Sequence, residues 1–192
     1  MKWILASASP RRRELLRLIT REFEVRISDC PEEVPAGFPV RKAPELLARQ
    51  KAEAVAVRFP EDLVIGADTG VFFGREMFGK PKDAEDAARM LRILSGKTHE
   101  VITGCALCLQ RKTHSFSVHS KVTFYPFGED EIRAYLQTGE SFDKAGAYGI
   151  QGRGSLLVQR IQGDYYNIVG LPVAALNREI RQFCLEAERK NL

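Results

Sequence analysis

The longest β-type segment in the first half of the chain is Leu63-Val64-Ile65-Gly66-Ala67-Asp68-Thr69-Gly70-Val71-Phe72-Phe73. It opens with three branched aliphatic residues and closes with a valine and two phenylalanines, a composition typical of a strand buried within a sheet. Gly74-Arg75 follows and favours a turn into a short return strand. The sequence therefore predicts a buried strand from Leu63 to Phe73, interrupted in its middle by one carboxylate, that of Asp68.

Asp68 stands out because burying an unpaired carboxylate costs several kcal/mol. One interpretation is a structural aspartate that caps a turn. The other is a catalytic group at the end of the strand, which binds a divalent cation or takes a proton from an attacking water, while Thr69 donates a hydrogen bond beside it. The position of Asp68 alone leaves both interpretations open.

A second candidate site lies near the N-terminus, where a strand at 3–5 precedes a helix predicted over about 10–20. Ser7 and Ser9 stand at the junction, and Arg11-Arg12-Arg13 opens the helix. Cations at a helix N-terminus oppose the helix dipole, whereas free amides there attract anions. Both features fit a bound polyphosphate, with serine hydroxyls and an arginine fork as donors. A solvated helix face with an ordinary serine cap is the alternative.

Periodicity and turn residues predict the other elements. The expected helices are 43–58, 84–94, 129–137 and 172–189, the expected strands are 23–27, 98–110, 114–125 and 155–162, and the expected loops are 28–42 and 141–154. The two longest strands are predicted to pair as a hairpin. Because βα units are mixed with a hairpin, we expect an α/β fold with a mixed, curved sheet in a single domain spanning residues 1–192.

The predicted loop 141–154 contains Asp143-Lys144-Ala145-Gly146-Ala147-Tyr148-Gly149-Ile150-Gln151-Gly152, in which glycines recur at every third position from Gly146. Glycine lets a ligand approach the backbone closely. The side-chain amide of Gln151 offers two donors and one acceptor, which suit part of the pairing edge of uracil or thymine. A plain glycine-rich loop is the alternative, since the pattern is neither a Rossmann nor a P-loop motif.

Composition narrows the class of protein. The chain has 192 residues, 44% of them hydrophobic, which is enough for the core of one domain. It lacks the roughly 20 consecutive apolar residues of a membrane span and the apolar core of a signal peptide, so we expect a cytoplasmic protein without membrane attachment. The formal net charge of +4 favours a small anionic substrate over stable nucleic-acid binding. Four cysteines are expected to stay reduced, and three scattered histidines favour oxygen ligands for any metal.

Six motifs occur in order along the chain. They are Ala6-Ser7-x-Ser9-Pro10-Arg11-Arg12, Gly66-Ala67-Asp68-Thr69, Lys80-Pro81, Leu94-Ser95-Gly96, the glycine-rich run from Asp143 to Gly152, and Val169-Gly170-Leu171-Pro172. Together they resemble the Maf family over residues 3–172. The resemblance implies an inosine-triphosphate-pyrophosphatase-like fold, with a mixed sheet flanked by helices and two lobes around a cleft. It also implies hydrolysis of nucleoside triphosphates to the monophosphate and pyrophosphate with Mg²⁺ or Mn²⁺, and a homodimer.

The resemblance also implies roles for individual residues. Asp68 matches the general base and, together with Glu32, the metal-binding acids. The phosphate-binding positions are Ser7, Arg12, Lys51 and Lys80, and the positions that mark the branch acting on dTTP and UTP are Arg11, Thr69 and Gln151. By residue type alone, Lys51, Lys80 and Glu32 would be solvated surface residues. Gly70 departs from the family pattern, which usually has an apolar residue there, and its flexibility would loosen the strand behind Asp68.

Two other functions compete with this hypothesis. The first is a nucleotide-sensing regulator of cell division and septum formation, in which turnover is incidental; the intact set of Asp68, Lys51 and Lys80 favours catalysis over sensing alone. The second is an RNA-binding protein, which requires basic residues interleaved with stacking aromatics. Only the triplet Arg11-Arg12-Arg13 supports it.

Overall fold

The computed structural model describes residues 1–189, in which seven strands form one sheet. The strand order is β2-β1-β3-β5-β6-β7, with β4 paired to β3. The strands are β1 (Trp3–Leu5), β2 (Glu24–Val25), β3 (Leu63–Phe73), β4 (Glu76–Phe78), β5 (Thr98–Leu109), β6 (Lys112–Phe124) and β7 (Val158–Gln162). β1 runs parallel to β2 and β3, whereas β3 pairs with β4, and β6 with β7, in antiparallel fashion. The predicted mixed sheet is confirmed.

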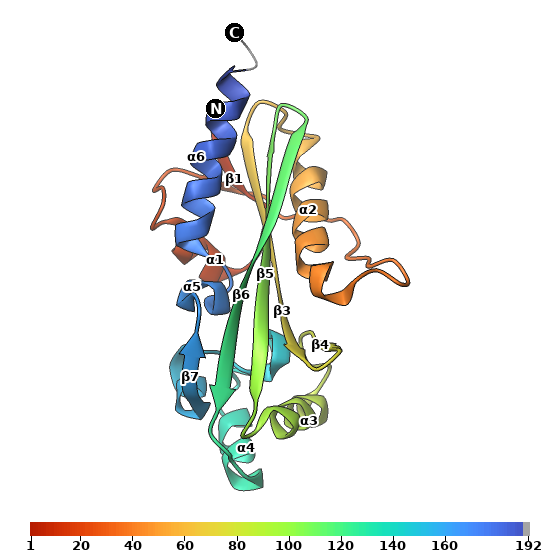
Figure 1. Cartoon of the computed structure of the whole chain (residues 1–192), viewed down its shortest axis with the longest axis vertical. Helices are drawn as coiled ribbons and strands as arrows, with labels where there is room; N and C mark the ends of the chain where they lie inside the picture. Colours follow the sequence, from red (N-terminus) through yellow and green to blue (C-terminus); the bar gives the residue numbers. More distant parts are fainter. Residues whose placement is uncertain (190–192) are drawn as a thin grey trace. The chain divides into compact units, whose positions relative to one another are not determined.

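Helices alternate with these strands along the chain (Figure 1). In residues 1–189 the α-helices are α1 (Pro10–Leu16), α2 (Ala43–Ala56), α3 (Ala84–Leu94), α4 (Glu129–Leu136), α5 (Tyr165–Val169) and α6 (Val173–Arg189), and the 3₁₀ helices are η1 (Val40–Lys42), η2 (Ala145–Ala147) and η3 (Gly152–Leu157). Each of these helices is too short or too polar to cross a bilayer. The predicted α/β class is confirmed.

Two predicted elements near the N-terminus are shorter than expected. α1 ends at Leu16, because the amides of Leu18 and Ile19 bond to carbonyls three residues earlier and tighten the last turn. The strand predicted at 23–27 is reduced to the two residues of β2. In both places the local pattern indicates the correct type of element, and for α1 the hydrogen bonds of its last turn decide where it ends.

The C-terminal third contains two further differences. The strand predicted at 155–162 begins only at Val158, since the preceding residues form η3, in which Ser155 Oγ donates to the Gly152 carbonyl at 2.7 Å. α5 is absent from the prediction. Asp164 begins it by accepting the amides of Tyr166 and Asn167 through Oδ1. Both differences arise from short side-chain contacts with the backbone, which hydrophobic periodicity does not report.

The chain divides into two compact units. The first comprises Met1–Asp68, Thr103–Val118 and the chain from Gly170, and the second comprises Thr69–Ile102 and His119–Val169. β3 passes from the first unit to the second between Asp68 and Thr69. The single domain and the cleft between two lobes stay predictions, and the last three residues of the predicted domain, 190–192, lie outside the described residues.

In the first unit, α2 packs closely on the strands because two glycines face it. A Cβ built on Gly66 of β3 would lie 2.2 Å from the Ala48 carbonyl oxygen, and one on Gly104 of β5 would lie 2.3 Å from the Glu45 amide nitrogen. Ala48 and Ala52 are fully buried, so the backbone of α2 lies almost directly on the sheet. Figure 1 shows α6 on the other side of these strands, so helices flank the sheet as predicted.

The second unit buries a histidine among aromatic rings. His99 is 2% exposed, its Nε2 lies 2.8 Å from the Tyr148 hydroxyl, and its ring packs edge-on against Phe124. Burial lowers the pKa of His99 to about 4, because the charged ring would lose its hydration. The folded protein therefore keeps this imidazole neutral at neutral pH.

We expect Gly66→Ala to lower the free energy of unfolding by about 3 kcal/mol, because the added methyl group would overlap the Ala48 carbonyl oxygen. Gly79→Ala is the matched control, since no atom lies within 4 Å of a Cβ built there. Urea unfolding of the two variants, followed by circular dichroism, checks the difference. Equal stability would contradict the close packing of α2 on β3.

The free energy of unfolding should also fall as the pH drops from 6.5 toward 4. In the unfolded chain His99 takes up a proton near its ordinary pKa of 6.5, whereas the folded ring stays neutral down to about 4. The contribution of His99 to the free energy of unfolding is fully present above pH 6.5. It is lost as the pH falls from 6.5 to about 4, at up to about 1.4 kcal/mol per pH unit. Urea unfolding of His99→Gln across the same range should show a smaller slope; a slope equal to that of the parent chain refutes this assignment.

Candidate functional site

Asp68 lies inside β3, two residues after Gly66, so both face the same side of the strand. α2 packs against this side through Ala48, and Lys51 lies one helical turn further along α2. Lys51 Nζ lies 2.6 Å from Asp68 Oδ1, and each of the two side chains is 14% exposed. The carboxylate is therefore paired within a strand, and the interpretation of Asp68 as a turn or cap residue is wrong.

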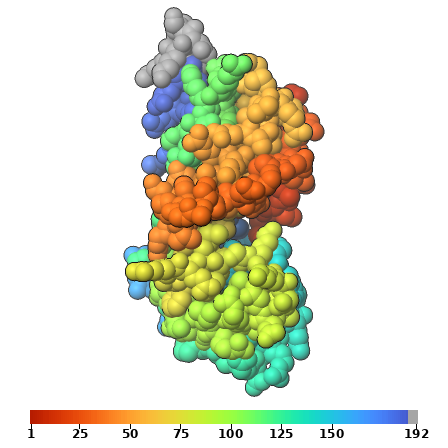
Figure 2. All heavy atoms as spheres, turned by 90° about the vertical axis from the view of Figure 1, so that its right-hand side faces the viewer, coloured from red at the N-terminus to blue at the C-terminus, as the bar shows by residue number. Residues whose placement is uncertain are grey.

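Glu32 approaches the same ammonium group from the loop that precedes η1. This loop runs over the surface of the first unit (orange in Figure 2), and the Glu32 side chain is 56% exposed. Glu32 Oε1 lies 3.0 Å from Lys51 Nζ. Lys51 thus bridges two carboxylates, one from β3 and one from the loop. Because both oxygens contact one nitrogen, they are close enough to share a single cation.

Arg12 is oriented by contacts with its own N-terminal turn and with the segment before α6. Its Nη1 donates to Ser7 Oγ at 3.3 Å, and its Nε donates to the Gly170 carbonyl at 2.9 Å. Ser9, the N-cap of α1, accepts the backbone amide of Arg12. Loss of hydration lowers the pKa of the Arg12 guanidinium, while the negative charge of Asp68 opposes this change. Arg12 therefore supplies a second, oriented cation close to Asp68.

The remaining predicted residues belong to two places. Arg11 precedes Arg12 in α1 and is partly buried. Thr69 is the first residue of the second unit, Lys80 is exposed after β4, and Gln151 is exposed in the glycine-rich loop. In that unit the Gly146 amide donates to the Gly79 carbonyl at 3.0 Å. This bond joins the residue before Lys80 to the glycine-rich loop.

Contacts therefore bring part of the predicted set together. Ser7, Arg12, Glu32, Lys51 and Asp68 form one connected cluster in the first unit. Lys80 and the glycine-rich loop are neighbours in the second unit. The sequence identified the members of the cluster by resemblance, and the structure adds the distances.

Two residues near Arg12 had no predicted role. Gly170 holds Arg12 through its carbonyl and has φ +125°, a conformation that favours glycine. It belongs to the motif Val169-Gly170-Leu171-Pro172, so the sequence marked the position without indicating the contact. Cys105 is buried beside Arg12, and burial raises its pKa to about 12, so the thiol stays neutral. Like Cys30 and Cys108, it is a free thiol.

Glu32 and Asp68 are the acids that suit a metal ion best. Within residues 1–189, no group of three or more His, Cys, Asp or Glu side chains is arranged to hold one. Mg²⁺, however, is commonly held by one or two carboxylates, with substrate phosphates and waters completing its ligands. The pair of oxygen donors at Lys51 fits a metal of that kind, which binds together with a phosphorylated ligand.

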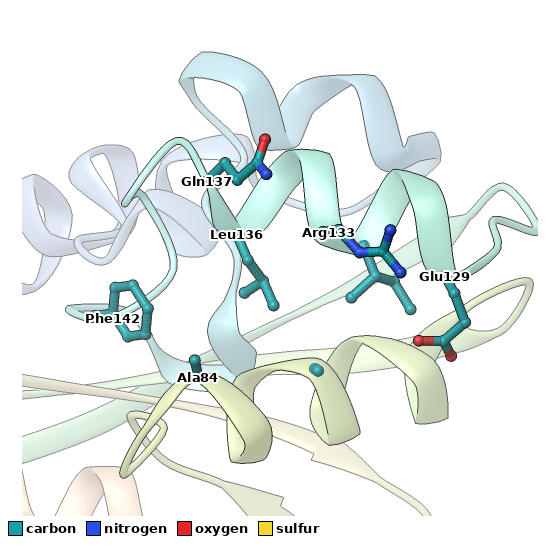
Figure 3. Close-up of a pocket in the computed structure, with 8 residues that line it drawn as sticks. Ala84, Glu129, Arg133, Leu136, Gln137 and Phe142 are labelled. Atoms are coloured by element: carbon teal, nitrogen blue, oxygen red, sulfur yellow. The ribbon is translucent and has the colours of Figure 1, made fainter.

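A separate groove lies between α3 and α4 in the second unit (Figure 3). Its volume is about 360 Å³, and its lining consists of Ala84, Ala88, Glu129, Ile132, Arg133, Leu136, Gln137 and Phe142. None of these is a predicted site residue. The charged lining residues are Glu129 and Arg133, which lie toward one end of the groove in Figure 3. The groove is therefore not part of the candidate site.

Comparison with known proteins places this chain in a family. The family model described as Maf-like protein matches residues 2–183. A protein of Bacillus cytotoxicus named dTTP/UTP pyrophosphatase is 52% identical over 182 residues, which cover 95% of each chain. One of the same name from Bacillus cereus is 49% identical over 185 residues, covering 96% of this chain and 97% of the relative.

The fold is also found in a solved structure. The Ham1 protein of Staphylococcus aureus superposes with a TM-score of 0.50 at 17% identity, covering 67% of this chain and 76% of its own. At that identity the likeness concerns the fold alone, and it agrees with the α/β architecture predicted from the sequence. The family match and the relatives, which are about half identical over nearly the whole chain, show that this protein belongs to the Maf-like family.

Proposed function

We propose that this chain is a nucleoside triphosphate pyrophosphatase that hydrolyses dTTP and UTP to the nucleoside monophosphate and pyrophosphate. The observation that carries the proposal is the cluster in which Lys51 bridges Asp68 and Glu32 beside Arg12. The names of the relatives, at 52% and 49% identity, support the same activity and the same substrates.

Asp68 is proposed as the general base. Water attacks the α-phosphorus, a new P–O bond forms, and the bond from that phosphorus to the bridging oxygen breaks, so that pyrophosphate leaves. A carboxylate in hydrogen-bond reach of the water accepts its proton. Lys51 contacts Oδ1 of Asp68, which leaves Oδ2 as the oxygen that takes up the proton. The ion pair with Lys51 thus holds the base in place.

The phosphates are proposed to bind to positive groups, which include Lys80 outside the cluster, and to the hydroxyl of Ser7. The charge that develops on the phosphate oxygens is stabilised by donors fixed in advance. Arg12 is fixed in this way, because Ser7 and Gly170 hold two of its nitrogens. The proposed phosphate ligands are Ser7, Arg12, Lys51 and Lys80, and the proposed determinants of the pyrimidine base are Arg11, Thr69 and Gln151.

A divalent cation, Mg²⁺ or Mn²⁺, is proposed to bind at Asp68 and Glu32. When bound, it would neutralise charge on the phosphate oxygens. Both acids already contact one cation, the ammonium group of Lys51, so their placement suits a shared positive ligand. The substrate phosphates would supply further oxygen ligands.

The Asp68→Asn variant should reduce kcat by about 100-fold or more, because the amide cannot accept the proton. Asp62→Asn is the matched control, since Asp62 lies in the same unit and its carboxylate accepts the exposed amide of Lys2 at 2.8 Å. Turnover of dTTP is followed by chromatography of dTMP and pyrophosphate in ¹⁸O-labelled water. The label should enter dTMP; its appearance in pyrophosphate, release of inorganic phosphate alone, or full activity of Asp68→Asn would contradict the mechanism.

Glu32→Gln should weaken metal binding about tenfold, because one of two anionic ligands is lost. Electron paramagnetic resonance titration with Mn²⁺ measures this binding directly, and the metal dependence of dTTP turnover should shift in parallel. Glu33→Gln is the control, since Glu33 is exposed beside it. Equal Mn²⁺ affinity in the two variants would exclude Glu32 as a metal ligand.

A further inference from the structure

Gln151 lies at the tip of a loop whose two ends are tied together. A Cβ built on Gly154 would lie 2.1 Å from the Gly149 carbonyl oxygen, so the backbone before Gln151 touches the backbone after it. The Gln151 side chain is exposed, and no hydrogen-bond partner for its amide occurs in the part of the chain that the structure describes. The loop therefore presents an unpaired amide on a closed backbone.

The C-terminal end of α4 and the segment that follows it hold the two sides of this loop. Before Gln151, the Gly149 amide donates to the hydroxyl of Tyr135, a buried residue of α4, at 3.0 Å. After it, Glu140 accepts the Arg153 amide through both carboxylate oxygens, at 3.1 and 3.0 Å, and the Gly154 amide at 3.4 Å. Bonds between a carboxylate and backbone amides are among the stronger hydrogen bonds in proteins.

Glu140 is itself anchored. Its backbone amide donates to Thr138 Oγ1 at 3.2 Å, and that hydroxyl donates to the Tyr135 carbonyl at 2.6 Å. Gly152 adds a steric constraint, because it has φ +67° and a Cβ there would lie 2.6 Å from Glu140 Oε1. A side chain at position 152 would displace the Glu140 carboxylate, so the contact between Glu140 and the loop requires glycine there.

We propose that Glu140 is a positioning residue for base recognition, which holds the loop so that Gln151 meets a pyrimidine carrying oxygen at C4. The proposal rests on the dTTP/UTP pyrophosphatase activity proposed above. A glutamine amide contains both donors and an acceptor, so a mobile one can turn to pair with cytosine as well as with thymine. When the backbone of the Gln151 loop is fixed, only some of these pairings are in reach. Selectivity between thymine and cytosine then depends on Glu140, although Glu140 does not touch the base.

Glu140→Gln is the test, since it keeps the shape of the side chain but retains only one oxygen to accept amides. KM for dTTP should rise about tenfold with kcat within about threefold of the parent, and the ratio of kcat/KM for dTTP over dCTP should fall about tenfold. Tyr135→Phe removes the other attachment and should change the ratio in the same direction. Glu131→Gln is the matched control, because Glu131 accepts the amide of Gly128 at 3.0 Å in the cap of α4 and does not contact the loop.

A double-mutant cycle with Gln151→Ala separates positioning from stability. In the Gln151→Ala background, Glu140→Gln should leave the dTTP/dCTP ratio unchanged, because the residue through which it acts is gone. A lowered melting temperature with an unchanged ratio, or an equal fall of the ratio in that background, overturns the proposal. If Glu140→Gln does not fold, Tyr135→Phe carries the same cycle. Absence of dTTP turnover by the parent chain would instead refute the proposed function.

Discussion

Burying a carboxylate within a strand costs several kcal/mol unless it is paired, and Lys51 pairs with Asp68 at 2.6 Å. The contact depends on Gly66, because the carbonyl of Ala48 occupies the space that a side chain there would fill. A larger residue would move α2 outward and Lys51 with it. The close packing of Gly66 in β3 against the alanine-rich face of α2 thus brings Lys51 within reach of Asp68.

The cluster of the first unit balances its charges before any ligand binds. Lys51 and Arg12 are positive, and Asp68 and Glu32 are negative. Under the proposed function, a triphosphate brings several negative charges and a divalent cation brings positive ones. Their joint binding avoids leaving an uncompensated charge in a poorly hydrated place, which gives a physical reason for a metal site made of only two acids.

The two units prepare their residues in different ways. Ion pairs and side-chain hydrogen bonds orient the charged groups near Asp68, whereas backbone hydrogen bonds from Tyr135 and Glu140 hold the loop of Gln151. Attraction between these charged groups and phosphate oxygens depends only weakly on direction. Selecting between bases depends on donor and acceptor positions, so it requires a fixed backbone.

The α/β class, most helices and the long hairpin could be predicted from the sequence, because hydrophobic periodicity and turn residues are local properties. The sequence also indicated, through the ordered motifs, which residues to expect at the site. The prediction began β7 three residues early, at 155 in place of Val158, and omitted α5; there the contacts of Ser155 and Asp164 with the backbone decide the structure. The ion pair of Asp68 with Lys51, and the hydrogen bonds of Tyr135 and Glu140 to the Gln151 loop, become visible only in the folded structure. The partners lie on different elements, and their contact depends on how closely those elements pack, which no local pattern encodes.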